Sequence, residues 1–337
     1  CWLRSIKLHA PNVSVLLVGT FLANVIIKKG NLQVIDKILR ELTKGSFAQI
    51  RVPGEVEVDE LIYFPIDNRE RFRIDQLRRA VEQCARDDQS VLQEVSIRSM
   101  AFLDSILSEK QKQKAYLTFS DEVKQLGTNV GVPSIREQEE ALAFFHERGF
   151  LIHMTSTEIL KNIVVINPQW LIDALSKVIR DGSIHIDFQE FKTVGLEEDA
   201  RSTFETALAS RDFLEYVWKG DQVEFFIDLM KRTMLLSEWD RDSYLIPSLL
   251  RDRYVLPETD ITGHWCLYNF SSGFLPTGVF QRLLCLCVEL SSRNGGNTNM
   301  KLFENFASIE LEKGSLVHLL ENKEAQAISV FTEKTHA

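Results

Sequence analysis

The chain has 337 residues, of which 45% are hydrophobic and 26% are charged, a composition typical of a soluble protein with two or three domains. Its formal net charge of −9 argues against a nucleic-acid-binding protein, because contacts to phosphate require basic surface. No apolar run approaches the roughly 18 residues of a membrane span, and no signal peptide opens the chain.

The first 90 residues alternate between strand and helix patterns. Residues 13–19 (VSVLLVG) form a continuous apolar run, which is typical of a strand covered on both faces. A helical pattern closing near Gly45, a second strand at 61–66 and a second helix from Ile74 follow. This spacing predicts part of a doubly wound α/β sheet over residues 1–90. Ligands of such sheets lie beyond the carboxyl ends of the strands, which are here at residues 20–23 and 67–68. The alternative interpretation is that these two loops bind no ligand.

Residues 91–250 predict a winged-helix-like α+β domain built from a helix, a helix, a β-hairpin and a helix. Ser120 is expected to cap a helix, and the pattern Ser134–Glu137 is a capping box for another that ends before Gly149. Asn167 and Pro168 predict the start of the helix after the hairpin. A second capping box at Asp221–Glu224 begins a weaker repeat of the same pattern. From residue 136 to 180 there are six acidic and five basic residues, which disfavours DNA binding.

Residues 251–337 predict a second small α+β domain. A strand from His264 to Phe270 precedes a helix that Pro276 begins, and three extended segments follow as an antiparallel meander. The helix is apolar almost all round, so we expect it to be buried.

Cysteine and histidine residues give no sign of a metal or redox site. The five cysteines lack C-x-x-C spacing, and their sparse, odd number favours buried thiols in a cytoplasmic protein: Cys1, Cys84, Cys266, Cys285 and Cys287. His146 and His153 lie near predicted apolar faces without a third ligand, so we expect hydrogen-bonded core residues and no metal. Because the chain begins with Cys and an amphipathic segment, we also expect a fragment of a longer protein.

Several strings resemble the Roco family, in which a Ras-like Roc GTPase domain precedes a COR domain. Those similar to Roc are VLLVGT at 15–20 and FPIDN at 64–68; those similar to COR are AFLD at 101–104, VVINPQWL at 164–171, YLIPSLL at 244–250 and the segment 274–284. The resemblance covers most of the chain. It implies the end of Roc at 1–90, the first half of COR at 91–250 and part of the second half at 251–337.

The resemblance also implies where a nucleotide would lie. The guanine loop of Roc usually reads Thr-His-x-Asp, and here the matching residues are Thr20, Phe21, Leu22 and Ala23. Alanine cannot accept the hydrogen bonds of a guanine edge, and each unpaired group costs roughly 1–3 kcal/mol. The nucleotide-proximal residues that we predict are Thr20, Phe21, Ala23, Asp67 and Asn68.

The machinery for GTP hydrolysis is missing from the sequence. A P-loop requires G-x-x-x-x-G-K-[ST], and the dipeptide Gly-Lys does not occur. We therefore expect no catalytic residue, no metal and no cofactor in this chain; GTP and Mg²⁺ belong to the parent protein by resemblance.

Our leading hypothesis is a regulatory and dimerisation module that couples a GTP-binding Roc domain to intracellular signal transduction. The expected partners are a second copy, through COR, and the upstream half of Roc; the residues assigned to the dimer contact are Phe274, Leu275, Phe280, Leu283 and Leu284. The alternatives are a complete GTPase whose P-loop lies upstream, with or without a downstream serine/threonine kinase, a pseudo-GTPase scaffold, and a winged-helix nucleic-acid-binding protein.

Overall fold

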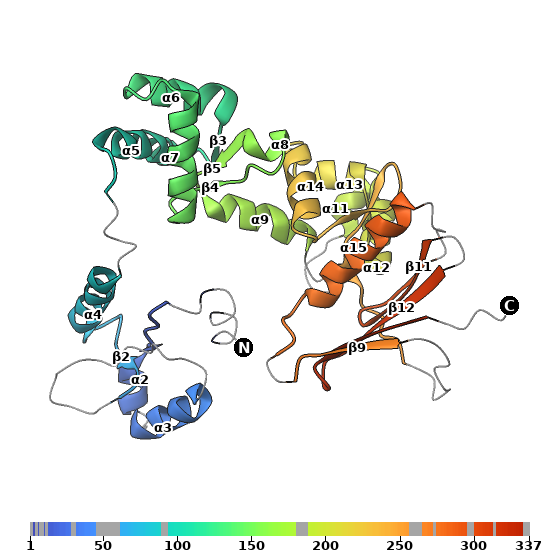
Figure 1. The fold of residues 1–337 in the computed structure, drawn as a ribbon, viewed down its shortest axis with the longest axis horizontal. Coiled ribbons are helices and arrows are strands. Elements are labelled where there is room, and N and C mark those ends of the chain that lie inside the picture. Colours follow the sequence, from blue (N-terminus) through green and yellow to red (C-terminus); the bar gives the residue numbers. More distant parts are fainter. Residues whose placement is uncertain are drawn as a thin grey trace. The chain divides into compact units, whose positions relative to one another are not determined.

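The computed structural model describes residues 3, 6, 10, 13–27, 32–44, 61–88, 94–179, 188–255, 265–271, 274–294, 300–312 and 315–332. These residues belong to two compact units, Cys1–Val95 and Ser96–Ala337 (Figure 1). The expectations for Cys1, Gly45 and His264 lie outside the described residues.

The first unit contains two parallel strands, β1 (Val18–Gly19) and β2 (Phe64–Pro65). The helices α2 (Leu22–Ile27) and α3 (Leu32–Thr43) connect them, and α4 (Ile74–Asp87) follows. The amide of Ile66 donates to the carbonyl of Gly19 at 2.8 Å, which fixes the register at the ends of the strands. The predicted parallel pairing is confirmed for these strands, whereas the doubly wound sheet as a whole stays a prediction.

The second unit begins with a helix and a small antiparallel sheet. Its elements are α5 (Ile97–Gln111), β3 (Tyr116–Thr118), the π-helical turn η2 (Phe119–Val123), α6 (Lys124–Asn129), α7 (Ile135–Glu147), β4 (Ile152–His153), α8 (Glu158–Lys161), β5 (Ile163–Val165) and α9 (Pro168–Val178). The strand order is β3-β5-β4, so the last strand of the hairpin lies in the middle.

The same arrangement then occurs again. The elements are α11 (Phe188–Thr193), α12 (Glu197–Thr206), β6 (Leu208–Ser210), α13 (Arg211–Val217), α14 (Val223–Arg232), β7 (Ser237–Glu238), β8 (Ser243–Leu245) and the 3₁₀ turn η3 (Pro247–Leu249). The strand order β6-β8-β7 matches β3-β5-β4, with two helices between the first and second strands in each case. The predicted repeat is confirmed in strand order, whereas α8 between β4 and β5 has no counterpart between β7 and β8.

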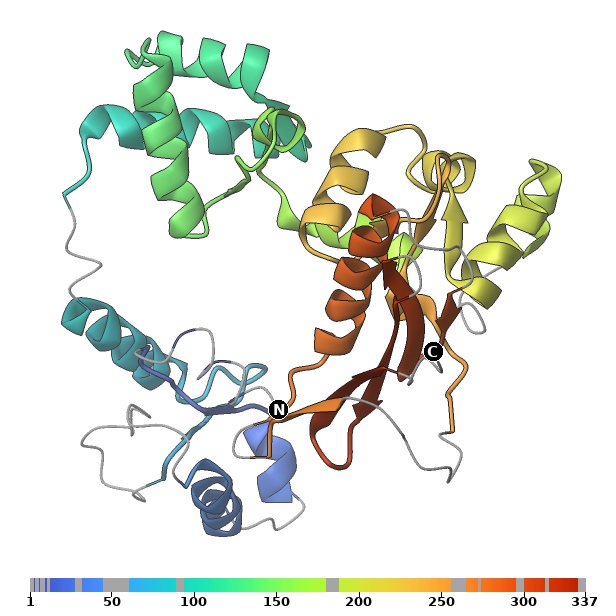
Figure 2. The same cartoon turned by 45° about the vertical axis from the view of Figure 1, so that its right-hand side comes forward.

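The last part of the second unit is a five-stranded antiparallel sheet with one helix on it (Figure 2). Its elements are β9 (Trp265–Asn269), α15 (Val279–Arg293), β10 (Lys301–Leu302), β11 (Phe306–Glu312), β12 (Ser315–Asn322) and β13 (Ala327–Thr332). The order β10-β11-β12-β13-β9 makes β9 an edge strand. The predicted antiparallel meander is confirmed.

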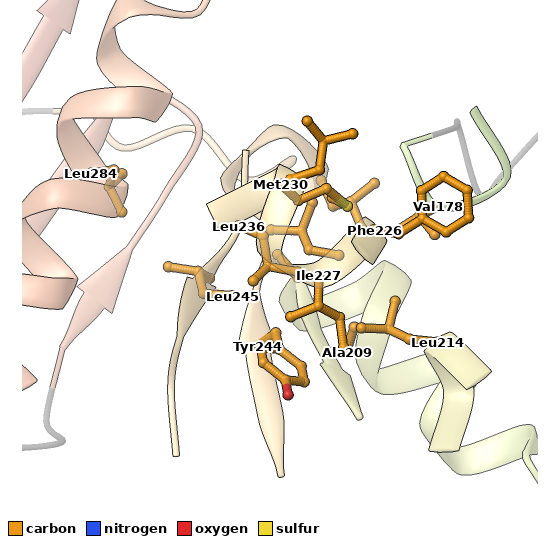
Figure 3. Close-up of a cluster of buried hydrophobic side chains, with 14 of the residues drawn as sticks. Val178, Ala209, Leu214, Phe226, Ile227, Met230, Leu236, Tyr244, Leu245 and Leu284 are labelled. Carbon is orange, nitrogen blue, oxygen red and sulfur yellow. The ribbon is translucent and has the colours of Figure 1, made fainter. Parts of the chain in front are cut away.

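Strand β5 is buried on both faces and joins two hydrophobic cores. Val164 packs with Phe102 and Phe145 in the core formed by α5, α6 and α7. Ile163 and Val165 belong to the larger core, which continues to α15. Figure 3 shows part of that larger core: labelled side chains of α9, α13, α14 and β8 lie together, and Leu284 of α15, in the same core, lies to their left. The run of β-branched residues is suited to such a strand, since each of its faces meets apolar side chains.

Several predicted helix signals are confirmed in the structure. The Ser134 hydroxyl accepts the N–H of Glu137, at 3.5 Å, and Asn167 Oδ1 accepts the N–H of Gln169, at 3.3 Å. Gly149 follows Arg148, the C-cap residue of α7, and has a φ of 74°. Glycine adopts this left-handed conformation without steric strain, because it has no Cβ.

Several expectations about the helices were wrong. Helix α15 begins at Val279, after Gly278, rather than at Pro276. Ser120 does not cap a helix, because the chain forms the π-helical turn and Glu122 accepts the N–H of Thr118 instead. The second capping box fails because α14 begins after Gln222, which is left-handed and makes no side-chain cap. Helix α15 is not buried all round: one face packs on the sheet, whereas Leu286 and Leu290 are exposed.

Replacing Phe145 with alanine should lower the free energy of unfolding of the second unit by about 3–5 kcal/mol, because the ring is fully buried and would leave a cavity. Urea denaturation followed by circular dichroism measures the change. The control Ile172→Ala, on an exposed position of α9, should stay within about 0.5 kcal/mol of wild type. Equal effects of the two substitutions would contradict the assigned core.

Candidate functional site

The carboxyl ends of β1 and β2 bring together the residues that the sequence predicted to lie near a nucleotide. Thr20 and Phe21 follow β1 directly, and the amide of Leu22 donates to the carbonyl of Ile66, at 3.1 Å. Phe21 has a φ of 61° and its side chain is 69% exposed. A left-handed backbone at an exposed aromatic residue is strained and persists only where neighbouring bonds hold it.

Asp67 supplies those bonds. Its Oδ2 accepts the N–H of Ala23 at 2.9 Å, and its Oδ1 accepts the N–H groups of Arg69 and Glu70 at 3.0 Å each. The N–H groups of Glu70 and then Ala23 hold the pKa of the Asp67 carboxyl below its ordinary value. Asp67 is therefore ionised, and it ties the loop after β1 to the turn after β2.

This arrangement leaves no carboxylate at the position that would read guanine. Ala23 contributes a methyl group and an N–H that Asp67 already binds. Asp67 itself is buried and its oxygens accept three backbone N–H groups. Asn68 is exposed at the start of the next turn. The proximity of these residues to a nucleotide stays a prediction.

The turn after Asp67 carries strain and positive charge that the sequence reasoning missed. Arg71 and Arg73 have φ values of 53° and 60°. Phe72 is 52% exposed, and the guanidinium carbon of Arg73 lies 5.4 Å from the centre of its ring. The run RERFR at 69–73 could have signalled this patch, because three arginines flank one aromatic residue.

The residues assigned to a dimer contact lie mostly inside the second unit. Phe280 and Leu284 are buried in its own core, because this face of α15 packs on the sheet, and Leu275, before the helix, is buried in the same core. Phe274 and Leu283 are half-buried. The apolar side chains that α15 leaves in solvent are others, Leu286 and Leu290, and local sequence does not distinguish the two faces of this helix. A dimer contact through the assigned residues stays a prediction.

His153 is a hydrogen-bonded core residue, as predicted. Its ring Nε2 lies 2.9 Å from the carbonyl oxygen of Lys161, and its ring stacks on Phe119. Burial is the main cause that lowers the pKa of His153 below its ordinary value. His146 is exposed rather than inward-facing, and its Nδ1 accepts the N–H of His153 at 3.3 Å.

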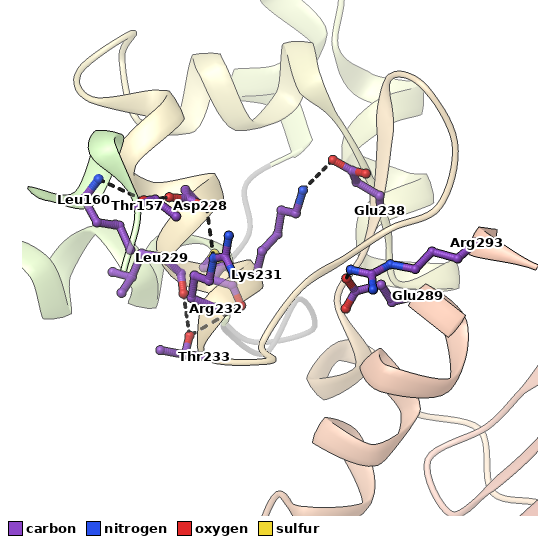
Figure 4. Close-up of polar contacts among 11 residues, drawn as sticks. Thr157, Leu160, Asp228, Leu229, Lys231, Arg232, Thr233, Glu238, Glu289 and Arg293 are labelled. Atoms are coloured by element: carbon purple, nitrogen blue, oxygen red, sulfur yellow. Dashed lines mark hydrogen bonds and ion pairs between the residues drawn. The ribbon is translucent and has the colours of Figure 1, made fainter. Parts of the chain in front are cut away.

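Side-chain hydrogen bonds join the two repeated arrangements of the second unit, and two of them involve carboxylates. The Thr157 hydroxyl donates to Asp228 on α14 and accepts the N–H of Leu160 at 3.2 Å, so that it also caps α8 (Figure 4). The Tyr116 hydroxyl donates to Asp221 at 2.8 Å. Sequence reasoning missed both contacts, because the partners are far apart in the chain.

An aromatic cluster lies beside these contacts. The ring of Trp170 at the start of α9 lies 4.8 Å from those of Tyr116 and Phe226, measured between centroids. Trp218 packs on the other side of Phe226 and donates its indole N–H to the carbonyl of Ala174, at 3.0 Å. The indole of Trp170 is thus half-buried in this cluster.

The thiols and the charged side chains form no metal centre in the part of the chain that is described. No group of three His, Cys, Asp or Glu residues there could hold a metal ion. Burial raises the pKa of Cys285 to about 12 and also raises that of Cys287, so neither thiol is reactive near neutral pH. Cys266 is exposed on β9. None of the described helices is long and apolar enough to span a membrane.

Residues 99–250 match the family model described as "C-terminal of Roc, COR-A domain". Two relatives come from Dictyostelium discoideum. The probable serine/threonine-protein kinase pats1 is 26% identical over 179 residues, and the probable serine/threonine-protein kinase qkgA is 25% identical over 203 residues. Each alignment covers 53% of this chain but only 5% of pats1 and 11% of qkgA.

The structure is also similar to Methanosarcina barkeri Roco2 RocCORdC bound to GDP. The TM-score is 0.47 and the sequence identity is 14%, over 74% of this chain and 68% of that one. The family match defines residues 99–250 as a COR-A domain, the domain that follows Roc. The match covers less than half of the 337 residues, so it shows a COR-A domain within the chain.

Replacing Asp67 with alanine should accelerate hydrogen exchange at the amides of Ala23, Arg69 and Glu70, because all three lose their acceptor. Exchange followed by NMR or mass spectrometry measures the rates. The matched control is Asp75→Ala, whose side chain is 83% exposed on α4, and it should leave these amides as they are. Unchanged rates in the Asp67 variant would show that the carboxylate does not hold the loop.

The stability of the second unit should fall as the pH drops below about 6.5, the ordinary pKa of histidine. Because the pKa of His153 is lowered in the folded state, the unfolded state binds the proton at a higher pH and is favoured as the pH falls. The loss of stability stops once the pH is below the folded-state pKa, where both states are protonated. Urea midpoints between about pH 7.5 and 5 measure this slope. His153→Gln should flatten it, whereas His146→Gln, at an exposed position, should keep most of it. Equal slopes for wild type and His153→Gln would refute the assignment.

Proposed function

We propose that this chain is a regulatory and dimerisation module of a Roco signalling protein, which couples a GTP-binding Roc domain to intracellular signal transduction. The observation that supports it best is the COR-A match over residues 99–250, directly after a unit with parallel strands. The printed names of the two Dictyostelium relatives, probable serine/threonine-protein kinases, support a signalling context. The expected partners are a second copy of COR and the upstream part of Roc.

The proposed role does not include GTP hydrolysis by these residues. GTP and Mg²⁺ would be bound by a P-loop elsewhere in the whole protein, and the sequence holds no Gly-Lys dipeptide that could belong to one. Ala23 and the fully engaged Asp67 favour a second candidate, a pseudo-GTPase scaffold, because neither offers guanine a free carboxylate. Kinase activity would belong to another part of the parent.

We infer that the two repeated arrangements are winged-helix-like and serve protein contacts rather than nucleic acid. In such units the second helix of the pair would read DNA. In the second arrangement that helix is α14, whose inner residues are buried in the core: Phe225, Phe226, Ile227, Leu229 and Met230. In the first it is α7, which exposes Glu137, Glu140 and Glu147 to solvent. Neither helix presents the basic surface that phosphate requires.

The free thiols support a reducing compartment. Cys84, Cys266, Cys285 and Cys287 form no disulfide with one another. We therefore propose that the protein works in the cytoplasm.

Light scattering of the chain over a range of concentrations, with and without GTP, tests the proposed function. We expect a dimer whose population rises with concentration and does not change with GTP. A monomer at all concentrations would remove the dimerisation role and leave the scaffold. A change in mass upon GTP addition would show that the chain senses nucleotide without a P-loop.

A further inference from the structure

The turn between β2 and α4 is a basic patch in an acidic chain. From residue 67 to 79 there are five arginines, no lysine and three acidic residues, and one of these acids, Asp67, is buried. Three of the arginines belong to the sequence RERFR at 69–73, which we call the Arg–Phe turn. Because the whole chain has a net charge of −9, the charge of this turn is opposite to that of its surroundings.

The guanidinium groups of the Arg–Phe turn are available to a ligand. Arg69 and Arg71 are exposed, and Arg73 is half-buried. Among the described residues, no carboxylate forms an ion pair with any of these three, whereas Arg78 on α4 pairs with Asp75. Arginine binds carboxylates through two parallel hydrogen bonds and is enriched at protein interfaces, where lysine is depleted. The turn thus presents the type of cation that suits a carboxylate ligand.

The exposed aromatic ring of the turn is held in a fixed position. Phe72 is 52% exposed, and the residues on both sides of it, Arg71 and Arg73, have left-handed φ values of 53° and 60°. Two backbone hydrogen bonds between Asp67 and Phe72, of 3.2 and 3.0 Å, close the turn. Strained conformations of this kind cluster at binding sites, since the bonds that hold them also preorganise the surface.

A second exposed ring lies on the loop that Asp67 ties to this turn. Phe21 is 69% exposed, and two residues further on the N–H of Ala23 donates to Asp67 Oδ2 at 2.9 Å. The loop itself, residues 20–24, has no charged residue. One carboxylate therefore holds together an edge of the first unit that offers two apolar rings and three guanidinium groups.

We propose that the Arg–Phe turn binds an acidic peptide segment of a partner protein, with carboxylates on the three arginines and an apolar side chain against Phe72. This interaction goes beyond the dimerisation role and does not depend on it. Opposite charge gives such a contact its specificity, and aromatic residues and arginine carry much of the binding energy at interfaces. Nucleic acid is disfavoured, because Glu70 and Asp75 interrupt the basic run that phosphates require.

Fluorescence anisotropy with the full chain tests the proposal. The probe is a fluorescein-labelled peptide with four glutamates on each side of one phenylalanine. We expect saturable binding that weakens as the ionic strength rises to about 0.15 M. The triple variant Arg69→Gln, Arg71→Gln, Arg73→Gln should raise the dissociation constant about tenfold or more, because it removes the groups that bind the carboxylates. Absence of binding to the wild-type chain at low ionic strength would overturn the proposal.

A matched control removes the same charge elsewhere. Arg86→Gln, Arg136→Gln and Arg293→Gln, combined in one variant, alter side chains that are 74%, 87% and 74% exposed on α4, α7 and α15. The dissociation constant should stay within about twofold of wild type, and circular dichroism confirms that both triple variants fold. An equal loss of affinity in the two would show that the peptide responds to overall charge, which would overturn the site.

A single substitution tests the apolar part of the contact. Phe72→Ala should raise the dissociation constant of the phenylalanine peptide about fivefold and leave unchanged that of the same peptide with alanine at its centre. Phe150→Ala, at a ring that is 47% exposed after α7, should change neither. An equal effect of Phe72→Ala on both peptides would contradict the contact with Phe72. Tighter binding of a single-stranded DNA of the same length than of the peptide would overturn the acidic peptide in favour of nucleic acid.

Discussion

The burial of β5 on both faces is the constraint on which the second unit depends. Three consecutive residues, Ile163, Val164 and Val165, are each at most 4% exposed. Alternate side chains therefore belong to different cores: Val164 packs in the smaller core, and Ile163 and Val165 pack in the larger one. One strand thus contributes side chains to the core of the helices that precede it and to the core shared with the repeat that follows.

The two repeats use one topology in two ways. Both place the last strand of a hairpin at the centre of a three-stranded sheet. In the first, α7 keeps an exposed acidic face; in the second, α14 is covered by apolar neighbours, and Met230 and Leu284 belong to the same core. The difference that matters here is which side chains the second helix of each repeat exposes. It makes the second repeat the structural link to α15 and leaves the first with an open surface.

Local sequence signals predicted much of this fold, and long-range contacts account for what they missed. The cap at Ser134, the Pro168 helix start and the glycine after α7 are encoded within a few residues, so they were readable. The exposed face of α15 could not be predicted, because the sequence pattern of an apolar helix is the same whether one face or both faces are covered. At the candidate site, the strand ends were enough to predict which residues lie together. The hydrogen bond from the Ala23 N–H to Asp67 was not predictable, because it joins positions 44 residues apart.

The bonds of Asp67 have a consequence for how the first unit could carry information. In many switches a ligand supplies the contacts that order a loop, and its departure releases that order. Here the protein supplies them itself: one internal carboxylate, fully engaged, fixes the loop after β1. A ligand bound at the ends of β1 and β2 would therefore find the loop after β1 already ordered. These three bonds would make the loop after β1 a fixed anchor rather than a moving switch.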